Sequence, residues 1–388
     1  MKNSRIALML GAAALGLFLR LCLPGTSIAQ QQPQPLDAGQ DYSGKRSEPV
    51  QYQVDFSAVV TAPYHTKVLH VWLPLPQSDA AQDVRDSQLS TFPVTVDPQI
   101  NTEPVYGNTF AYFEFRSPKG AQIIRHRFQA KVWQMDWDVD PGRIIPVEHW
   151  PESFVPYFRD VDGLAANDAF QGVLQNLLKG GRSPAASLFA SIQWIDRNMK
   201  YDHVQASLQA SAEHAFQQRR GHCSDYHGLC ATFGRSLGVP TRVAYGLNMF
   251  PKESPSHCKM EAFLPPYGWV SFDLSETQKL IALIEKAPTL SDEEKAVYAA
   301  AARNRLQRGF RDNTWLAVTR GVDYALVPPA SQSVRVVRTI YAEADGVPLP
   351  EPDPANPNQR TFAWMTAHDF QADRQVAYPY KDYTSLDK

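Results

Sequence analysis

Between residues 51 and 139 the chain alternates polar and apolar residues in short runs that are broken by Pro, Gly and Asn. A period of two places successive side chains on opposite faces of a strand, so each run can bury only one face. Five or more such strands need a second sheet to cover them, which predicts an antiparallel β-sandwich over residues 49–142. The runs are QYQVDFSAVV, KVLHVWLPLP, FPVTVDP, NTFAYFEF and IIRHRFQAKVWQMDW.

After residue 150 the periodicity becomes helical. In SPAASLFASIQWIDRNMKYD, Ser183 is suited to cap a helix and Pro184 to occupy its first position. The apolar residues at 188, 192, 195 and 199 then form a single stripe, which we expect to be buried in the core. A second helix is expected from about Ser224 to Gly238, ahead of a proline.

Strand-like and helical runs alternate in the rest of this region. TRVAYGLNMF, HCKMEAFL and WVSFDLS read as strands, and Ser291 is the expected cap of a later helix. We therefore expect an α+β fold, with one domain over residues 150–345 and a Pro-rich linker and tail over residues 346–388.

The N-terminus has the character of a secretory signal peptide. A basic start, an apolar run and small residues before Ala29 predict removal of residues 1–29 and export to the periplasm or beyond the cell. An uncleaved anchor is the alternative, but Arg20 interrupts the apolar run before it is long enough to span a bilayer, so no stable membrane insertion is expected after cleavage. Residues 30–48, rich in Gln, Pro, Asp and Ser, are expected to form a disordered leader.

The charge of the mature chain argues against nucleic acid as a partner. Residues 1–29 contain three of the 38 basic residues and no acidic one, so 35 basic and 40 acidic residues remain and the formal charge is −5. Nucleic-acid-binding domains instead carry a basic footprint.

Three of the four cysteines remain in the mature chain, at positions 223, 230 and 258. An odd and sparse set in an oxidising compartment is not a disulfide framework, and the unpaired thiol is expected to be reactive. Cys230 and Cys258 could still pair with each other. Otherwise both are expected to be small core residues, Cys258 because it should point away from the face of its strand that carries His257.

Cys223 stands at the start of the second predicted helix, directly after "GH". Backbone N–H groups and the helix dipole favour negative charge there, so the thiol should ionise readily. Gly221 should leave room for a substrate backbone to approach. This placement suits a nucleophile.

A cysteine nucleophile needs a base and a group that orients the base. SHCKMEAFLPPYGWVSFDLSET offers His257 and Asp273 on the two strands of a predicted hairpin. A four-residue loop would pair Asp273 with Met260 and leave it on the wrong face. A three-residue loop, Pro265–Tyr267, pairs Asp273 with Lys259 and brings His257 within reach, so the mechanism predicts the three-residue loop or a bulge.

These segments resemble the transglutaminase-like superfamily. The resemblance rests on GHCSDYHGLCATFGRSLGVPTRVAYG, SHCKMEAF and GWVSFDLSE, and it covers about residues 185–280. It implies a papain-like core in which a helix packs on an antiparallel sheet. Lys259 and Met260 depart from the family, because many members carry a tryptophan and a small apolar residue after the histidine.

By this resemblance Cys223 corresponds to the nucleophile, His257 to the general base and Asp273 to the orienting carboxylate. The backbone N–H of Cys223 is the expected oxyanion donor, and Tyr201 is a candidate second donor whose alternative role is to pack on the core. His222, Asp225 and His227 are expected to border the site without belonging to the three catalytic positions.

The resemblance thus implies an exported thiol hydrolase that cleaves peptide or other amide bonds through a thioester, with a protein or peptide substrate and no cofactor. Amine cross-linking is an alternative outcome of the same chemistry, and a catalytically inactive scaffold is an alternative of another class. A metal site is the rival that local spacing supports, because Cys223, His227 and Cys230 share one helical face and His222 or His257 could complete four ligands.

Overall fold

The computed structural model describes residues 36–207, 209–251, 255–352 and 363–387. The expected signal peptide, and residues 30–35 of the expected leader, lie outside this range. The described residues form one contact unit of α+β class, in which two antiparallel sheets accompany a helical region packed on a third sheet. None of the described helices is long and apolar enough to cross a membrane.

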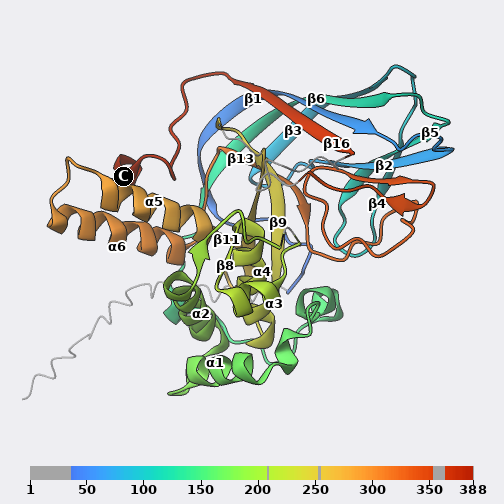
Figure 1. Cartoon of the computed structure of the whole chain (residues 1–388). Coiled ribbons are helices and arrows are strands. Elements are labelled where there is room, and N and C mark those ends of the chain that lie inside the picture. Colours follow the sequence, from blue (N-terminus) through green and yellow to red (C-terminus); the bar gives the residue numbers. More distant parts are fainter. Residues whose placement is uncertain (1–35, 208, 252–254, 353–362, 388) are drawn as a thin grey trace, which may run out of the picture. The chain divides into compact units, whose positions relative to one another are not determined.

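The expected β-sandwich is present, and its first sheet is built from both ends of the chain. Its strand order is β12-β6-β1-β16, and β3 also pairs with β6. Figure 1 shows the C-terminal strand β16 beside β1, where nine residue pairs run from Tyr52↔Ala372 to Val60↔Trp364. The strands are β1 (Lys45–Thr61), β3 (Gln82–Phe92), β6 (Ala121–Asp136), β12 (Phe310–Arg311) and β16 (Trp364–Ala372).

The second sheet has the order β15-β14-β2-β5-β4. Alternate residues of its strands and of the first sheet point into one shared apolar cluster, as the period of two requires. Its strands are β2 (Val68–Leu75), β4 (Gln99–Thr102), β5 (Thr109–Arg116), β14 (Tyr341–Ala344) and β15 (Val347–Pro348).

Two expectations for the β region need correction. The run FPVTVDP is not a strand beyond Phe92, because two prolines interrupt it and remove backbone donors. The strand in this part of the chain is β3, which is mostly exposed and carries polar residues on both faces. Residues 346–388 are not only linker and tail, since they contain β15, β16 and the 3₁₀-helix η4 (Tyr383–Leu386).

Residues 36–48 are ordered, unlike the expected leader. Ala38 and Tyr42 are buried in the main core. The Tyr42 hydroxyl donates to Glu261, and the indole N–H of Trp269 donates to the Ala38 carbonyl at 2.9 Å. These two contacts fasten the segment to the third sheet, which supplies the apolar surface that its own composition lacks.

The third sheet and the helices carry the candidate site. The sheet order is β11-β10-β9-β13, and α4 packs on β9 and β10. Ser183 caps α2 with Pro184 at the first turn, and Ser291 caps α6 with a capping box, both as predicted. The strands are β9 (Thr241–Asn248), β10 (Ser256–Phe263), β11 (Trp269–Phe272) and β13 (Trp315–Arg320).

Most helices pack around α4. Figure 1 shows α5 and α6 side by side away from the sandwich, with a small apolar cluster of their own between them. The helices are α1 (Asp168–Leu178), α2 (Pro184–Asn198), α3 (Ala212–Gln218), α4 (Cys223–Ser236), α5 (Leu274–Lys286) and α6 (Asp292–Arg308). The remaining elements are η1 (Pro141–Arg143), η2 (Glu152–Phe158), η3 (Leu164–Ala166) and the short parallel pair β7 (Lys200–Tyr201) and β8 (Arg220–Gly221).

The C-terminal strand should contribute strongly to stability. Trp364 is 4% exposed in the sandwich core, whereas its neighbour Met365 is 52% exposed. We expect Trp364→Ala to lower the free energy of unfolding by about 3–5 kcal/mol, because it removes a large buried side chain. Met365→Ala, the matched control, should change it by less than about 0.5 kcal/mol. Urea unfolding measures both, and equal effects would mean that β16 does not close the core.

Candidate active site

Cys223 is the first residue of α4. His222 before it and Asp225 after it hold the start of the helix in place. The His222 side chain accepts from the Ser224 N–H at 3.3 Å, and the Asp225 carboxylate accepts from the His222 N–H at 3.1 Å. This reciprocal capping box leaves Cys223 at the positive end of the helix dipole. Asp225 also accepts from the backbone N–H of Ser207 at 3.1 Å, so it ties the preceding loop to the helix.

Gly221 is required by the capping box rather than by substrate access. Its φ is +154°, and a Cβ atom there would lie 2.4 Å from Asp225 Oδ2. The space that we expected a substrate backbone to use is therefore filled by the capping carboxylate. Any side chain at position 221 would displace the residue that orients the start of α4.

The β10–β11 hairpin has the three-residue connection that the mechanism requires. Phe263 pairs with Trp269 and Met260 with Phe272, and the Leu264 N–H donates to the Gly268 carbonyl at 2.9 Å. Continuing this register places Asp273 across from Lys259. His257 Nε2 then lies 2.8 Å from Asp273 Oδ2.

Strand β13 fixes the backbone of His257 from the other side. The indole N–H of Trp315 donates to the His257 carbonyl at 3.2 Å. Gly246 is the β9 partner of His257, and a Cβ atom there would lie 2.2 Å from the Leu316 carbonyl and 2.6 Å from the Trp315 ring. The glycine therefore allows the two strands to approach closely where the imidazole is held.

Cys223 and His257 interact through their side chains. His257 Nδ1 is buried and has no hydrogen-bond partner among the described residues, and Cys223 lines the same small pocket as His257. Hydrogen bonding from Cys258, followed by the charge of His257, brings the pKa of Cys223 well below its ordinary value against the effect of burial. Burial opposes protonation of His257, but Asp273 and Cys223 raise its pKa overall. The pair therefore favours a thiolate beside an imidazolium.

The Asp273 carboxylate is buried and has several partners. Its Oδ1 accepts from the Glu276 N–H at 3.1 Å and so caps α5, whereas its Oδ2 also accepts from Lys259 Nζ at 2.8 Å. Burial would raise the pKa of Asp273, but His257 and Lys259 bring it well below its ordinary value. The carboxylate is therefore ionised.

Lys259, the residue that departs from the family, bridges two buried acids. Its Nζ lies 2.7 Å from Asp312 Oδ1 in addition to its contact with Asp273. Burial would lower the pKa of Lys259, but the two carboxylates raise it overall. Asp312 gave no signal in the sequence, because it lies 53 residues from its partner on the loop before β13.

The two other thiols differ in their surroundings. Cys230 is buried in the core, where burial raises its pKa. Cys258 is also buried in the core, as expected, and it additionally lines the pocket over Cys223. Its Sγ lies 3.6 Å from His227 Nδ1. All three cysteines of the described chain are free.

A small pocket lies over the nucleophile and has a volume of about 20 Å³, roughly the space that one water molecule needs. Tyr201 lines it and also packs on the core, so the structure is compatible with both of its expected roles. Sequence reasoning missed six of its lining residues as site residues, of which only Ser224, Ser256 and Cys258 lie next to predicted ones in the chain. The six are His203, Ser224, Tyr245, Ser256, Cys258 and Arg338.

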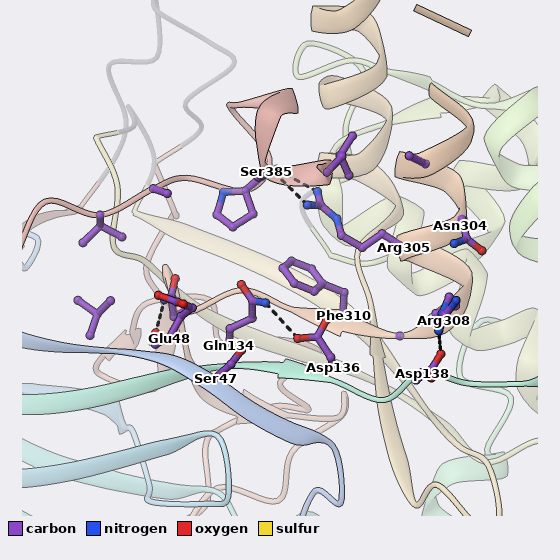
Figure 2. A pocket seen from close by; sticks show the side chains of 18 of the residues that line it. Ser47, Glu48, Gln134, Asp136, Asp138, Asn304, Arg305, Arg308, Phe310 and Ser385 are labelled. Carbon is purple, nitrogen blue, oxygen red and sulfur yellow. Dashed lines mark hydrogen bonds and ion pairs between the residues drawn. The ribbon is translucent and has the colours of Figure 1, made fainter. Parts of the chain in front are cut away.

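A much larger cavity of about 690 Å³ lies elsewhere, between the ends of β1 and β6, helix α6 and the C-terminal residues. Figure 2 shows several of its polar side chains engaged by neighbours, as in the ion pair between Arg308 and Asp138. Arg305 donates to Ser385 Oγ at 3.2 Å. Cys223, His257 and Asp273 do not line it.

The metal-binding rival finds no support in the described residues, where no group of three or more His, Cys, Asp or Glu side chains is arranged to hold a metal ion. His227, which shares a helical face with Cys223, instead accepts a hydrogen bond from the Leu274 N–H at 3.2 Å.

Part of the chain matches a known protein family. The model of the transglutaminase-like superfamily matches residues 171–274, a segment that contains Cys223, His257 and Asp273. An uncharacterised protein of Haemophilus influenzae is 25% identical over 158 residues, which are 35% of this chain and 41% of that protein. The chain thus spans less than half the length of this curated relative.

One solved structure shares the fold over most of this chain. A candidate cysteine protease from Cytophaga hutchinsonii superposes with a TM-score of 0.57 at 13% identity, covering 88% of this chain and 97% of that one. At this identity the likeness concerns the fold alone. A TGase structure with a TM-score of 0.23, at 14% identity, covers 46% of this chain and 43% of that chain.

The buried lysine should be needed for stability. We expect Lys259→Met to lower the free energy of unfolding by about 3–5 kcal/mol, because it leaves Asp273 and Asp312 buried without their shared cation. Asp312→Asn in the same chain should recover part of the loss. Lys295→Met, which removes an exposed ion pair with Asp292, is the control and should cost less than about 1 kcal/mol. Urea unfolding at neutral pH measures these changes. A loss of free energy of unfolding for Lys259→Met as small as that for Lys295→Met would contradict the prediction.

Proposed function

Because residues 171–274 are a transglutaminase-like superfamily domain, we propose that this chain is a cysteine-dependent hydrolase or acyltransferase acting on peptide or other amide bonds. The observation that carries the proposal is the convergence of Cys223, His257 and Asp273 from the start of α4, from β10 and from the end of β11. This is the arrangement of nucleophile, base and orienting group that thiol acyl transfer needs.

In the proposed mechanism the Cys223 thiolate attacks the carbonyl carbon of the substrate amide and forms a tetrahedral oxyanion. The N–H of Cys223 at the start of α4 is the donor best placed for that oxyanion, and Tyr201 lines the same pocket as a second candidate. His257 then transfers its Nδ1 proton to the leaving amine, the C–N bond breaks, and a thioester remains.

The second half of the reaction uses the same residues in reverse. Neutral His257 removes a proton from water, or from an acceptor amine, and this nucleophile displaces Cys223 from the thioester. Asp273 holds the ring so that Nδ1 faces the sulfur, and it stabilises the imidazolium whenever that forms. Water as acceptor gives hydrolysis, which we propose as the main outcome.

Export belongs to the proposal as well. The basic and apolar N-terminus supports a protein that acts in the periplasm or outside the cell on protein or peptide substrates. N-terminal sequencing of the mature protein tests this part, and the first 29 residues should be missing.

The activity can be tested on a protein mixture incubated with the purified chain, with and without a primary amine. Mass spectrometry should find cleaved peptides, and it would find incorporated amine if acyl transfer prevailed. Cys223→Ala should reduce either product by roughly 10⁴-fold or more, because it removes the nucleophile. Cys230→Ala is the matched control and should remain active. Products that survive in Cys223→Ala, or their absence with every substrate, would refute the proposal, the second result favouring a non-catalytic scaffold.

The pH dependence of kcat/KM gives an independent test. The lowered pKa of Cys223 makes the thiolate available at pH values below those at which an ordinary thiol ionises, and the raised pKa of His257 keeps the ring protonated above its ordinary range. The pH range over which kcat/KM is constant should therefore extend to both lower and higher pH. Asp273→Asn should lower kcat by about 10²–10⁴-fold and move the alkaline limb to lower pH, because the carboxylate that stabilises the imidazolium is gone. An unmoved alkaline limb would contradict this role.

A further inference from the structure

Cys258 occupies a position that the proposed mechanism does not explain. Its side chain is 1% exposed, yet it lines the same pocket of about 20 Å³ as Cys223, and it contributes to the lowered pKa of that thiol. A second thiol in contact with a nucleophile either donates its proton to the sulfur or accepts one from it. Neighbouring groups on α4 and α5 decide between these alternatives.

His227 determines the direction of the hydrogen bonds. The Leu274 N–H belongs to the first turn of α5, where it has no partner within the helix, and it donates to His227 Nε2 at 3.2 Å. A ring nitrogen that accepts a hydrogen bond carries no proton, so the neutral ring of His227 carries its proton on Nδ1. Burial favours this neutral form and lowers the pKa of His227 to about 4.

His227 Nδ1 is therefore a donor, and its neighbour at 3.6 Å is Cys258 Sγ. The Cys258 sulfur accepts a hydrogen bond from His227. The S–H proton of Cys258 can therefore point toward Cys223, which lines the same pocket. Burial, and then the hydrogen bond and charge of Cys223, raise the pKa of Cys258 well above its ordinary value, so it keeps this proton.

We propose that Cys258 donates its S–H to the Cys223 thiolate, and that His227 is a positioning residue that directs this donor through its Nδ1–H. The relay runs from the Leu274 backbone through His227 and Cys258 to the nucleophile. It rests on the proposed function for its catalytic meaning, since it stabilises the attacking form of Cys223. It adds a donor from a side chain that is 1% exposed and lines the same small pocket as the sulfur.

Other ionisable groups also face Cys223, and a test must hold them constant. They are His222 at the N-cap of α4, His257 on β10, Tyr201 on β7, Tyr245 on β9, His203 and Arg338. Substitutions confined to Cys258 and His227 leave all six in place. Alkylation of Cys223 by iodoacetamide, followed by peptide mapping, reports its thiolate fraction without any substrate. The readout therefore remains valid even if the proposed amide chemistry fails.

The decisive comparison is between Cys258→Ala and Cys258→Ser, measured in the full chain under reductant so that the adjacent thiols stay reduced. Cys258→Ala removes the donor, and we expect alkylation of Cys223 on the acid side of its profile to fall by about three- to tenfold. Cys258→Ser keeps a hydroxyl donor and should retain most of the wild-type rate. Cys230 is also buried but lies on α4, so Cys230→Ala is the control and should leave the alkylation profile of Cys223 unchanged.

Two results would overturn the proposal. One is a Cys258→Ala protein that melts like the wild type and alkylates with an unchanged profile. The other is an equal shift in Cys258→Ala and Cys258→Ser, since that would point to packing rather than to a donated proton. For the positioning residue, His227→Leu should shift the profile in the direction of Cys258→Ala, while His227→Asn retains an N–H near Nδ1 and should shift it less. A His227→Leu profile identical to wild type would remove His227 from the relay.

Discussion

One buried carboxylate joins the fold to the candidate site. Asp273 caps α5 through Oδ1 and binds both His257 and Lys259 through Oδ2. Removing a carboxylate from water is costly unless hydrogen bonds and opposite charges compensate for it. The hairpin register, the start of α5 and the orientation of the imidazole therefore depend on the same anion, and a change that misplaces the helix also misplaces the base.

The charges around that anion explain why Lys259 is compatible with a working base. Asp273 and Asp312 carry two negative charges and Lys259 carries one positive charge, so the buried group retains one net negative charge that an imidazolium at His257 neutralises. Without Asp312, Lys259 would cancel the effect of Asp273 on the ring. Asp312 precedes β13, so the electrostatics of the site depend on a segment beyond the hairpin.

The features of the fold that depend on neighbouring residues could be predicted from the sequence. The helix caps, the three-residue loop and the meeting of His257 with Asp273 follow from spacing, because a strand alternates and a hairpin has few possible registers. The same alternation rule correctly placed Cys258 in the core, but it could not predict that this thiol would also line the pocket at the start of α4. Strands that pair across a long sequence separation, such as β16 and β1, leave no local pattern in the sequence. Their pairing could therefore not be predicted from neighbouring residues.

The match to the superfamily ends at residue 274, and what distinguishes this chain lies largely after it. Asp312 tunes the base, Arg338 lines the pocket over Cys223, and β14 and β16 complete the sandwich. Arg338 is held by Glu351 Oε1 at 2.9 Å, so its guanidinium is already paired beside the nucleophile. A substrate that enters this small pocket has to meet that ion pair. Residues 171–274 thus contain Cys223, His257 and Asp273, whereas the segment after them adds Arg338 to the pocket over the sulfur and contributes strands to both sheets of the sandwich, namely β12, β14, β15 and β16.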